Sequence, residues 1–423
     1  MYTLTHSNLI AAMAWLPFLA IPAGLAMIDF VILTRSRVLK APGLHGQLIP
    51  SRDFTILVPI FGNIKYLKNT QVLRRYPGQV ILCTTTRESS EFNARLERVA
   101  RRYNFRIFRS DVPRASATSR ANPWSLFRKT LEHKPIVTGR DLGEAARDEI
   151  IRDSFSAVTT AYCIFVDGDT VAKDNLSLLT GLMVEQGYDL ASVRVLASKT
   201  GTLMEKLQSV EYAVAMDSRR IYPWLTSGAA MIARTNVIKQ VMAHHSLFFS
   251  GGDIEIGKLA SVLHRKVGHL DFVFLTDVPS TFKAWFKQRM AWCGGAFRHA
   301  IVNIFRHSWR YPFFFFYATI VVYGLMPMRL YEAIKYPLIL PEVIVLYWII
   351  IFLFHRRDWQ WFYWLFPLYA LLQVMIIVPL GIYTYLRMAY SQRNVGIIWL
   401  RGNEPAVLPP GRHALPLCTA DRI

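Results

Sequence analysis

Cysteine is scarce in this sequence, and no two cysteines lie close together in a motif. The 423 residues contain four of them, with no CxxC pair and no spacing typical of a metal site: Cys83, Cys163, Cys293 and Cys418. This pattern argues against a disulfide framework and suits a reducing compartment.

Acidic residues are also few compared with basic ones. The chain has 29 Asp and Glu against 49 Lys and Arg, a net charge of +20, and most of the excess lies between about residues 35 and 310. Such a charge is typical either of nucleic-acid binding or of a cytosolic segment beside anionic lipid. Because apolar segments flank this region on both sides, we favour the membrane and expect no nucleic-acid partner.

The first apolar segment covers residues 9–33 and is followed by Arg35, Arg37 and Lys40. A signal peptide carries its positive charge before the apolar run, not after it. We therefore predict a retained transmembrane anchor at residues 1–34 that leaves the following domain in the cytosol.

The second apolar region contains residues 311–328, 337–354 and 361–386, each about long enough to cross ~30 Å of hydrocarbon. Three spans would leave the C-terminus outside, whereas the basic tail at residues 389–423 favours the inside. A re-entrant or interfacial first segment would resolve this conflict. We predict a C-terminal transmembrane region at residues 311–388.

The pattern of residues 35–310 is typical of a soluble domain in which strands alternate with helices. Apolar runs predict strands at 54–60, 79–83, 105–108 and 162–166, and amphipathic patterns predict helices at 64–75, 88–103 and 141–158. This order indicates an α/β fold, a mostly parallel sheet with helices on both faces. The polar, basic stretch at residues 110–139 is either a mobile functional loop or a disordered insertion.

The first chemical motif is Asp167-Gly168-Asp169, directly after the strand at 162–166. Ligands of such sheets bind at the carboxyl ends of the strands. Two carboxylates placed there can share a divalent cation with the diphosphate of a sugar nucleotide. An ordinary Asp-Gly turn is the simpler alternative.

Two further motifs follow in the sequence. Asp253 opens a helix after two glycines and is either a general base for an acceptor hydroxyl or a helix N-cap. Gln288, Arg289 and Trp292 lie on a helix that is both aromatic and basic. They offer donors for a diphosphate and a flat face for a sugar ring, or they belong to an amphipathic membrane anchor.

Together the three motifs resemble the membrane-integrated, inverting glycosyltransferases of family 2. This group includes hyaluronan, chitin and cellulose synthases and nodulation-type chitooligosaccharide synthases. The resemblance covers roughly residues 50–310 and includes the segments 55–61, 139–140, 226–230 and 276–281. It implies a GT-A-type domain at 35–310, with interfacial helices near 202–220 and 281–307.

The resemblance also implies roles for individual residues. Asp253 would be the catalytic base, and Asp169 would hold Mn²⁺ or Mg²⁺. The acceptor would contact Ser227, Gly228 and Trp292. The nucleotide-sugar donor would contact Pro59, Phe61, Arg140, Asp167, Gln288 and Arg289.

This chain departs from the family pattern in three places. Ala291 stands where the Gln-x-x-Arg-Trp motif has arginine, which leaves Arg289 or Lys287 as replacements. Gly252 stands where the usual Gly-Glu-Asp has glutamate, and residues 83–86 lack the carboxylate that usually reads uracil.

The implied function is a processive polysaccharide synthase of the plasma membrane, with a cytoplasmic catalytic domain and a UDP-sugar donor. A single-transfer enzyme that makes a glycolipid, similar to ceramide glucosyltransferases, is the alternative. A transporter or scaffold with an inactive domain is a third. It is weakened because the spans carry few charges, with Arg329, Glu332 and Lys335 near a span end.

Overall fold

The computed structural model describes residues 27, 30–31, 42–44, 48–111, 143–247, 250–301, 308–355 and 360–392. The chain divides into two compact units, and each is described by itself. The sheet unit comprises Ala41–Ser198, Arg219–Asp277 and Met388–Ile423, and the helical unit Met1–Lys40, Lys199–Ser218 and Val278–Arg387. Nearly all of the predicted anchor, most of the loop at 110–139 and most of the basic tail lie outside the described residues.

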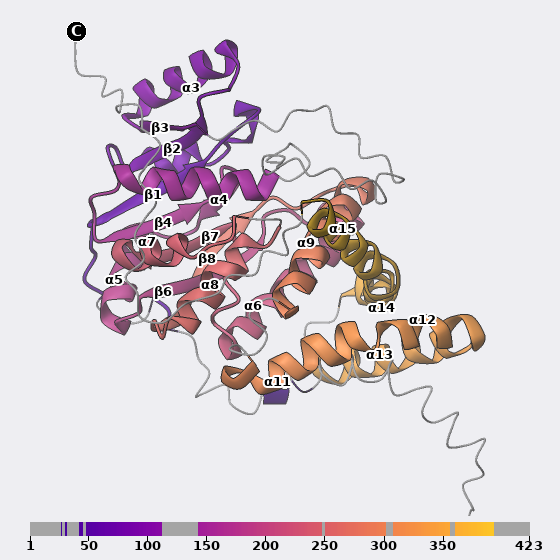
Figure 1. The fold of residues 1–423 in the computed structure, drawn as a ribbon. Coiled ribbons are helices and arrows are strands. Elements are labelled where there is room, and N and C mark those ends of the chain that lie inside the picture. The colour runs from indigo at the N-terminus through magenta and orange to yellow at the C-terminus, as the bar shows by residue number, and fades with distance from the viewer. Residues whose placement is uncertain are drawn as a thin grey trace, which may run out of the picture. The chain divides into compact units, whose positions relative to one another are not determined.

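The sheet unit is built on an eight-stranded mixed sheet with the order β3-β2-β1-β4-β7-β6-β8-β5 (Figure 1). Neighbouring strands are parallel in four pairs, β3–β2, β2–β1, β1–β4 and β6–β8, and antiparallel where β7 and β5 join. The strands are β1 (Phe54–Pro59), β2 (Val80–Thr85), β3 (Arg106–Ser110), β4 (Tyr162–Val166), β5 (Val171–Ala172), β6 (Leu190–Ala197), β7 (Ala230–Arg234) and β8 (Val267–Thr276). The predicted α/β fold with a mostly parallel sheet is confirmed.

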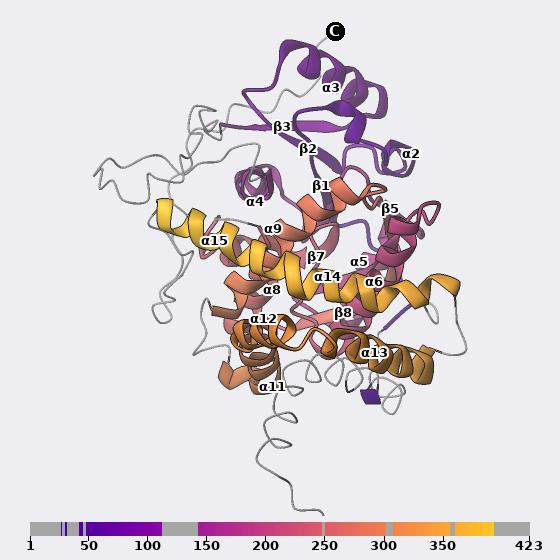
Figure 2. The same cartoon turned by 90° about the vertical axis from the view of Figure 1, so that its right-hand side faces the viewer.

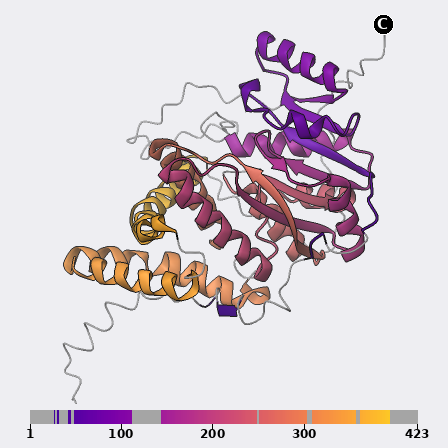
Figure 3. The same cartoon turned by 180° about the vertical axis from the view of Figure 1, so that it is seen from behind.

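Helices α4 (Gly143–Ser154), α7 (Thr235–Ala243) and α8 (Gly252–Val262) pack against one face of the sheet. Their apolar side chains form one core with those of six strands, β1, β2, β3, β4, β6 and β7, and Figure 3 shows the sheet from behind. β1 and β4 are buried along their whole length, as expected for strands that are covered on both faces. The sheet unit also contains α3 (Ser90–Tyr103), capped by Ser89, and α5 (Leu176–Gln186).

The helix predicted at residues 64–75 is wrong in its extent. The chain forms a short 3₁₀ turn, Ile64–Tyr66, and a four-residue helix α2, Thr70–Leu73. Between them, the buried Asn69 side chain donates hydrogen bonds to the carbonyls of Asp167 and Thr170, both at 3.0 Å. This bonding ties the segment to the turn after β4 and interrupts the helix.

Helix α8 approaches the segment before β7 very closely. A Cβ atom on Gly257 would lie 2.0 Å from the carbonyl oxygen of Trp224. Glycine is therefore required at this contact. The close approach sets the N-terminal turn of α8 against residues 226–228.

The helical unit contains α6 (Leu203–Ile221, of which residues up to 218 belong here) and α9 (Phe282–Ile301), followed by apolar helices. Two helices, Pro312–Lys335 and Trp361–Tyr390, are long and apolar enough to cross a membrane, and Ile339–Leu353 is shorter. The elements are α11 (Pro312–Phe315), the π-helix η5 (Phe316–Gly324), α12 (Met326–Lys335), α13 (Ile339–His355), η7 (Trp361–Leu365), α14 (Phe366–Leu372), the π-helix η8 (Gln373–Ile377) and α15 (Val378–Gln392), which can be followed in Figure 2.

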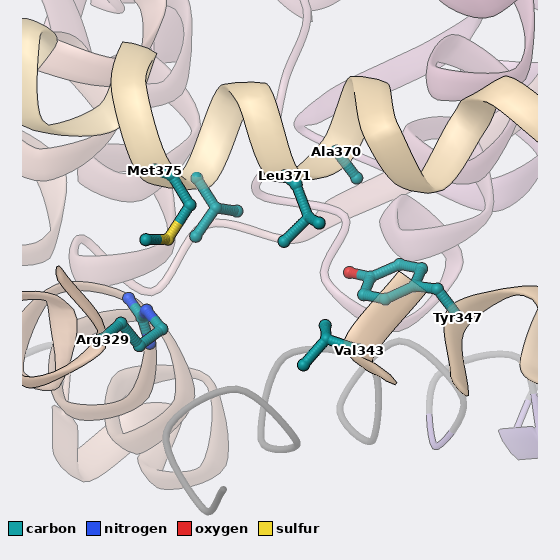
Figure 4. A pocket seen from close by; sticks show the side chains of 7 residues that line it. Arg329, Val343, Tyr347, Ala370, Leu371 and Met375 are labelled. Carbon is teal, nitrogen blue, oxygen red and sulfur yellow. The ribbon is translucent and has the colours of Figure 1, made fainter. Parts of the chain in front are cut away.

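A small cavity lies among α12, α13, α14 and η8 (Figure 4). Its walls are apolar apart from Tyr347 and Arg329, which is buried. The Arg329 guanidinium donates to the carbonyls of Val321, at 2.6 Å, and Val322, both in the π-helix η5. The buried charge is therefore bound to backbone oxygens of the π-helical turns that precede α12.

Candidate active site

The turn after β4 presents Asp167 and Asp169 at the carboxyl edge of the sheet. The Asp167 amide donates to the carbonyl of Ala229 at 2.9 Å, and the carbonyl of Gly168 accepts from the amide of Lys68 at 2.7 Å. A Cβ atom on Gly168 would lie 2.9 Å from the carbonyl oxygen of Tyr66. Glycine between the two aspartates thus allows the Lys68 segment to pack against the turn.

Arg147, on α4, joins two of the predicted motifs. Its Nε donates to Asp167 Oδ1 at 3.0 Å, and its Nη2 donates to the carbonyl of Gly228. Arg147 could not be predicted from the sequence, because its partners Asp167 and Gly228 are distant in the chain. The only signal in the sequence was its place on the helix that precedes the strand of Asp167.

The Asp253 motif meets the Arg147 cluster at Gly228. The Gly228 amide donates to Asp253 Oδ2 at 2.6 Å. A Cβ atom on Gly228 would lie 3.4 Å from that oxygen and 3.5 Å from Nη1 of Arg147. The structure therefore brings Asp167, Gly228 and Asp253 around one guanidinium.

The alternative that Asp253 is the N-cap of its helix is wrong. The N-cap position is Gly251, with a φ of 89°, and Asp253 lies within the first turn of α8. Its backbone carbonyl accepts from the hydroxyl of Thr226, and its carboxylate bonds to Gly228. Glu255, two residues on, is held elsewhere, since it accepts from Ser246 N at 2.9 Å and from Ser246 Oγ at 2.8 Å.

Asp169 has an unusual electrostatic environment. Burial raises its pKa to about 6, helped by the negative charges of Asp167 and Asp277. Lys68 pairs with Asp277, and this hydrogen bond raises the pKa of the lysine. The carboxylates are thus crowded, with a lysine beside them.

Asp277 is a second residue of this site that was not predicted from the sequence. It follows β8, which is parallel to β6, and β6 and β4 are both antiparallel to β7. β8 and β4 therefore run in the same direction, so their carboxyl ends lie at one edge of the sheet. Its place after a strand was the signal that could have revealed it.

Among the residues that the structure describes, no group of three or more His, Cys, Asp or Glu side chains forms a ready-made metal site. Mg²⁺ and Mn²⁺ prefer oxygen ligands, and Mg²⁺ commonly binds one or two carboxylates together with substrate phosphates. The partly buried Asp169 carboxylate, with its raised pKa and acidic neighbours, fits such a cation.

The predicted donor residues after β1 lie at the same edge. Pro59 ends β1, Phe61 packs beside the core, and Ser227 is buried beside Gly228. Arg140 lies outside the described residues.

The carboxylate of Glu88 accepts from the amide of Gly62 at 3.0 Å and from the hydroxyl of Thr85 at 3.2 Å. A carboxylate thus lies near the end of β2, three residues beyond Thr85.

Gln288, Arg289 and Trp292 lie on α9 in the helical unit. The Arg289 side chain is 1% exposed, and it bonds to Glu211 Oε2 at 2.8 Å and to Gln288 Oε1 at 2.8 Å. The Cζ atom of Arg289 also lies 4.1 Å from the centroid of the Trp292 ring. Burial disfavours its charge, but Glu211 outweighs that effect and raises the pKa of the arginine.

Arg289 and position 291, where the family motif has arginine, do not face the same way on α9. Positions i and i+2 of an α-helix are about 200° apart around its axis, so the side chains at 289 and 291 leave α9 in different directions. The charge of Arg289 is directed to Glu211. Its predicted contact with a diphosphate stays a prediction.

Solved structures resemble this fold. A mannosyltransferase from Pyrobaculum calidifontis, in complex with GDP-Man and Mn²⁺, is 9% identical, with a TM-score of 0.53 over 88% of this chain and 98% of its own. Residues 1–349 of TarS from S. aureus match with 12% identity, 79% and 91% coverage and a TM-score of 0.37. Glucosyl-3-phosphoglycerate synthase from Mycobacterium tuberculosis matches with 13% identity, 60% and 85% coverage and a TM-score of 0.35.

The first of these similarities defines the class of fold as GT-A-like α/β. The model of glycosyl transferase family group 2 matches residues 162–378, just over half of the chain. The chain therefore belongs to this glycosyltransferase family. None of the curated proteins matches the sequence.

The Arg289–Glu211 pair gives a prediction for the helical unit. Arg289→Gln should lower the free energy of unfolding by about 3 kcal/mol, because Glu211 keeps a partly buried charge without its partner. The double variant Arg289→Gln/Glu211→Gln should lose less than the sum of the two single changes. Thermal denaturation in detergent measures both, with the exposed Lys287→Gln as control. Additive losses would show that the pair is not coupled.

Proposed function

We propose that this chain is an inverting, nucleotide-sugar-dependent glycosyltransferase that extends a polysaccharide at the plasma membrane. The observation that carries the proposal is the cluster in which Arg147 connects Asp167 with Gly228, whose amide holds Asp253. This cluster combines a donor-side carboxylate, an acceptor-side segment and a candidate base. Membership of the glycosyltransferase family supports the reaction class.

Asp253 is the proposed general base. The acceptor oxygen forms a bond to the anomeric carbon while the bond from that carbon to the diphosphate oxygen breaks. The acceptor proton passes to Asp253, and the nucleoside diphosphate leaves with the electron pair. Attack from the face opposite the leaving group inverts the configuration. The hydrogen bond from Gly228 orients the carboxylate for this proton transfer.

Asp169 is the proposed ligand of Mn²⁺ or Mg²⁺, with Asp277 beside it. The cation would neutralise charge on the diphosphate leaving group. The Pyrobaculum mannosyltransferase structure contains GDP-Man and Mn²⁺, so a protein of this fold holds a nucleotide sugar together with a divalent metal. We propose a UDP-sugar for this chain and place Glu88, Pro59 and Phe61 on its nucleotide side.

The proposed membrane location rests on the apolar helices of the helical unit and on the charges that follow the first apolar run of the sequence. The two long apolar helices and a third shorter one have the length and composition of membrane segments. Large apolar side chains such as Ile349, Phe352 and Leu353 are exposed along α13, which suits contact with lipid. The basic residues after the first apolar run favour a cytoplasmic catalytic domain. A polysaccharide or a lipid is the proposed acceptor.

The function is tested in inverted membrane vesicles, whose cytoplasmic face is outward. A panel of radiolabelled UDP- and GDP-sugars is added, and the product is sized. We expect incorporation in inverted but not in sealed right-side-out vesicles, and a ladder of long products. A single, solvent-extractable product would favour the glycolipid alternative. No incorporation from any donor would contradict the proposed glycosyltransferase activity.

Removal of the metal gives a second prediction. Transfer should stop in excess EDTA and return with Mn²⁺ or Mg²⁺, because the leaving diphosphate needs a counter-charge. Asp169→Asn should bind the nucleotide sugar more weakly in calorimetry, whereas Asp174→Asn, at an exposed position nearby, should bind it normally. Full transfer in EDTA would remove Asp169 from this role.

The proposed base gives a third prediction. Asp253→Asn can still accept the hydrogen bond from Gly228, but an amide cannot take the acceptor proton. Turnover should fall by about 10²–10⁴-fold, while nucleotide affinity should change little. Glu255→Gln on the same helix is the control, because Glu255 faces Ser246, and its turnover should stay near that of the wild type. Near-normal transfer by Asp253→Asn would return this residue to a structural role.

A further inference from the structure

The carboxylate of Asp148 lies where a side chain at position 252 would be. A Cβ atom on Gly252 would lie 1.5 Å from Oδ2 of Asp148 and 2.6 Å from its Cγ. The carboxylate of Asp148, which comes from α4, thus fills the place where a side chain at position 252 would begin. Position 252 is also where the family pattern has the glutamate of Gly-Glu-Asp, next to the proposed base.

Asp148 is enclosed by polar partners at this place. It is 2% exposed, and its Oδ1 lies 3.3 Å from Nη1 of Arg147. Its Oδ2 lies 4.0 Å from Nε2 of His245. His245 donates from Nε2 to the carbonyl of Gly252 at 3.0 Å and accepts at Nδ1 from the amide of Leu247 at 3.0 Å. These two bonds place the imidazole proton on Nε2, and the guanidinium of Arg147 is a positive charge beside Asp148.

Arg147 is therefore held from two sides. Asp148 lies on its own helix, and Asp167 and the carbonyl of Gly228 lie on the sheet side. A guanidinium with carboxylates in two directions is fixed more tightly than one with a single partner. Its orientation matters because the same group connects Asp167 with the loop that bonds to Asp253.

We propose that Asp148 supplies, from α4, the carboxylate that this chain lacks at position 252. In this role Asp148 is a positioning residue, which holds Arg147 between the donor motif and the proposed base. The inference rests on the proposed function, because it assigns a role within the same reaction. It also explains why glycine follows Gly251, since any larger residue would displace the carboxylate of Asp148.

The test moves the carboxylate from one backbone position to the other. Five proteins are compared: wild type, Asp148→Asn, Asp148→Gly, Gly252→Asp and the double variant Asp148→Gly/Gly252→Asp. Asp148→Asn keeps the shape of the side chain, so it should melt close to the wild type but lose about 10²-fold in kcat through a misplaced Arg147. Gly252→Asp alone should melt lower, because its side chain collides with Asp148. The double variant should melt above Gly252→Asp and regain at least tenfold of the turnover lost in Asp148→Gly.

Glu149→Gln is the matched control, because it removes a carboxylate from the same helix where Glu149 pairs with Arg152. It should keep the kcat of the wild type. A wild-type kcat in Asp148→Asn would overturn the proposal, as would a folded double variant no more active than Asp148→Gly. If the double variant does not fold, the kcat of Asp148→Asn decides. Absence of transfer by the wild type would refute the proposed function instead. The melting temperatures of Gly252→Asp and the double variant would still test whether a side chain at position 252 collides with Asp148.

Discussion

One guanidinium, that of Arg147, is the interaction on which the candidate site depends. It bonds to Asp167 at the end of β4 and to the carbonyl of Gly228 before β7, with Asp148 beside it. Carboxylates this close repel one another unless a cation lies among them. The apolar side of α4 packs in the core of the sheet, which brings the arginine to this edge. Gly257 lets α8 approach from the other direction, so that Asp253 reaches the Gly228 amide.

The need to pair charges inside the protein also shapes the helical unit. A buried charge is costly unless it is paired or bonded. Arg289 meets this requirement through Glu211 and Gln288, and Arg329 meets it through two carbonyls of the π-helix η5. The wider turn of a π-helix changes how its carbonyls are aligned, and here two of them accept from one side chain. Among the aromatic and basic residues of α9, Arg289 is therefore turned inward, whereas Phe282 and Lys287 are exposed.

The sequence was sufficient to predict the central strands, because β1 and β4 are short, continuous apolar runs of the kind that only a doubly covered sheet accommodates. The place of Asp167 and Asp169 followed from the rule that ligands bind at the carboxyl ends of strands. The broken helix at Asn69 could not be predicted, since its cause is a pair of hydrogen bonds to a turn far along the chain. Arg147, Asp148 and Asp277 were missed for the same reason. Their partners become neighbours only when the sheet is assembled.

The ion pair between Lys68 and Asp277 has a consequence for the proposed metal site. Lys68 follows the 3₁₀ turn after β1, and Asp277 follows β8, so the pair links two loops across the carboxyl edge of the sheet. The lysine also lowers the electrostatic cost of ionising Asp169. The chain thus carries a tethered counter-ion of its own beside the acidic residues. The two loops are therefore linked by side chains of the chain itself, without a contribution from the proposed cation.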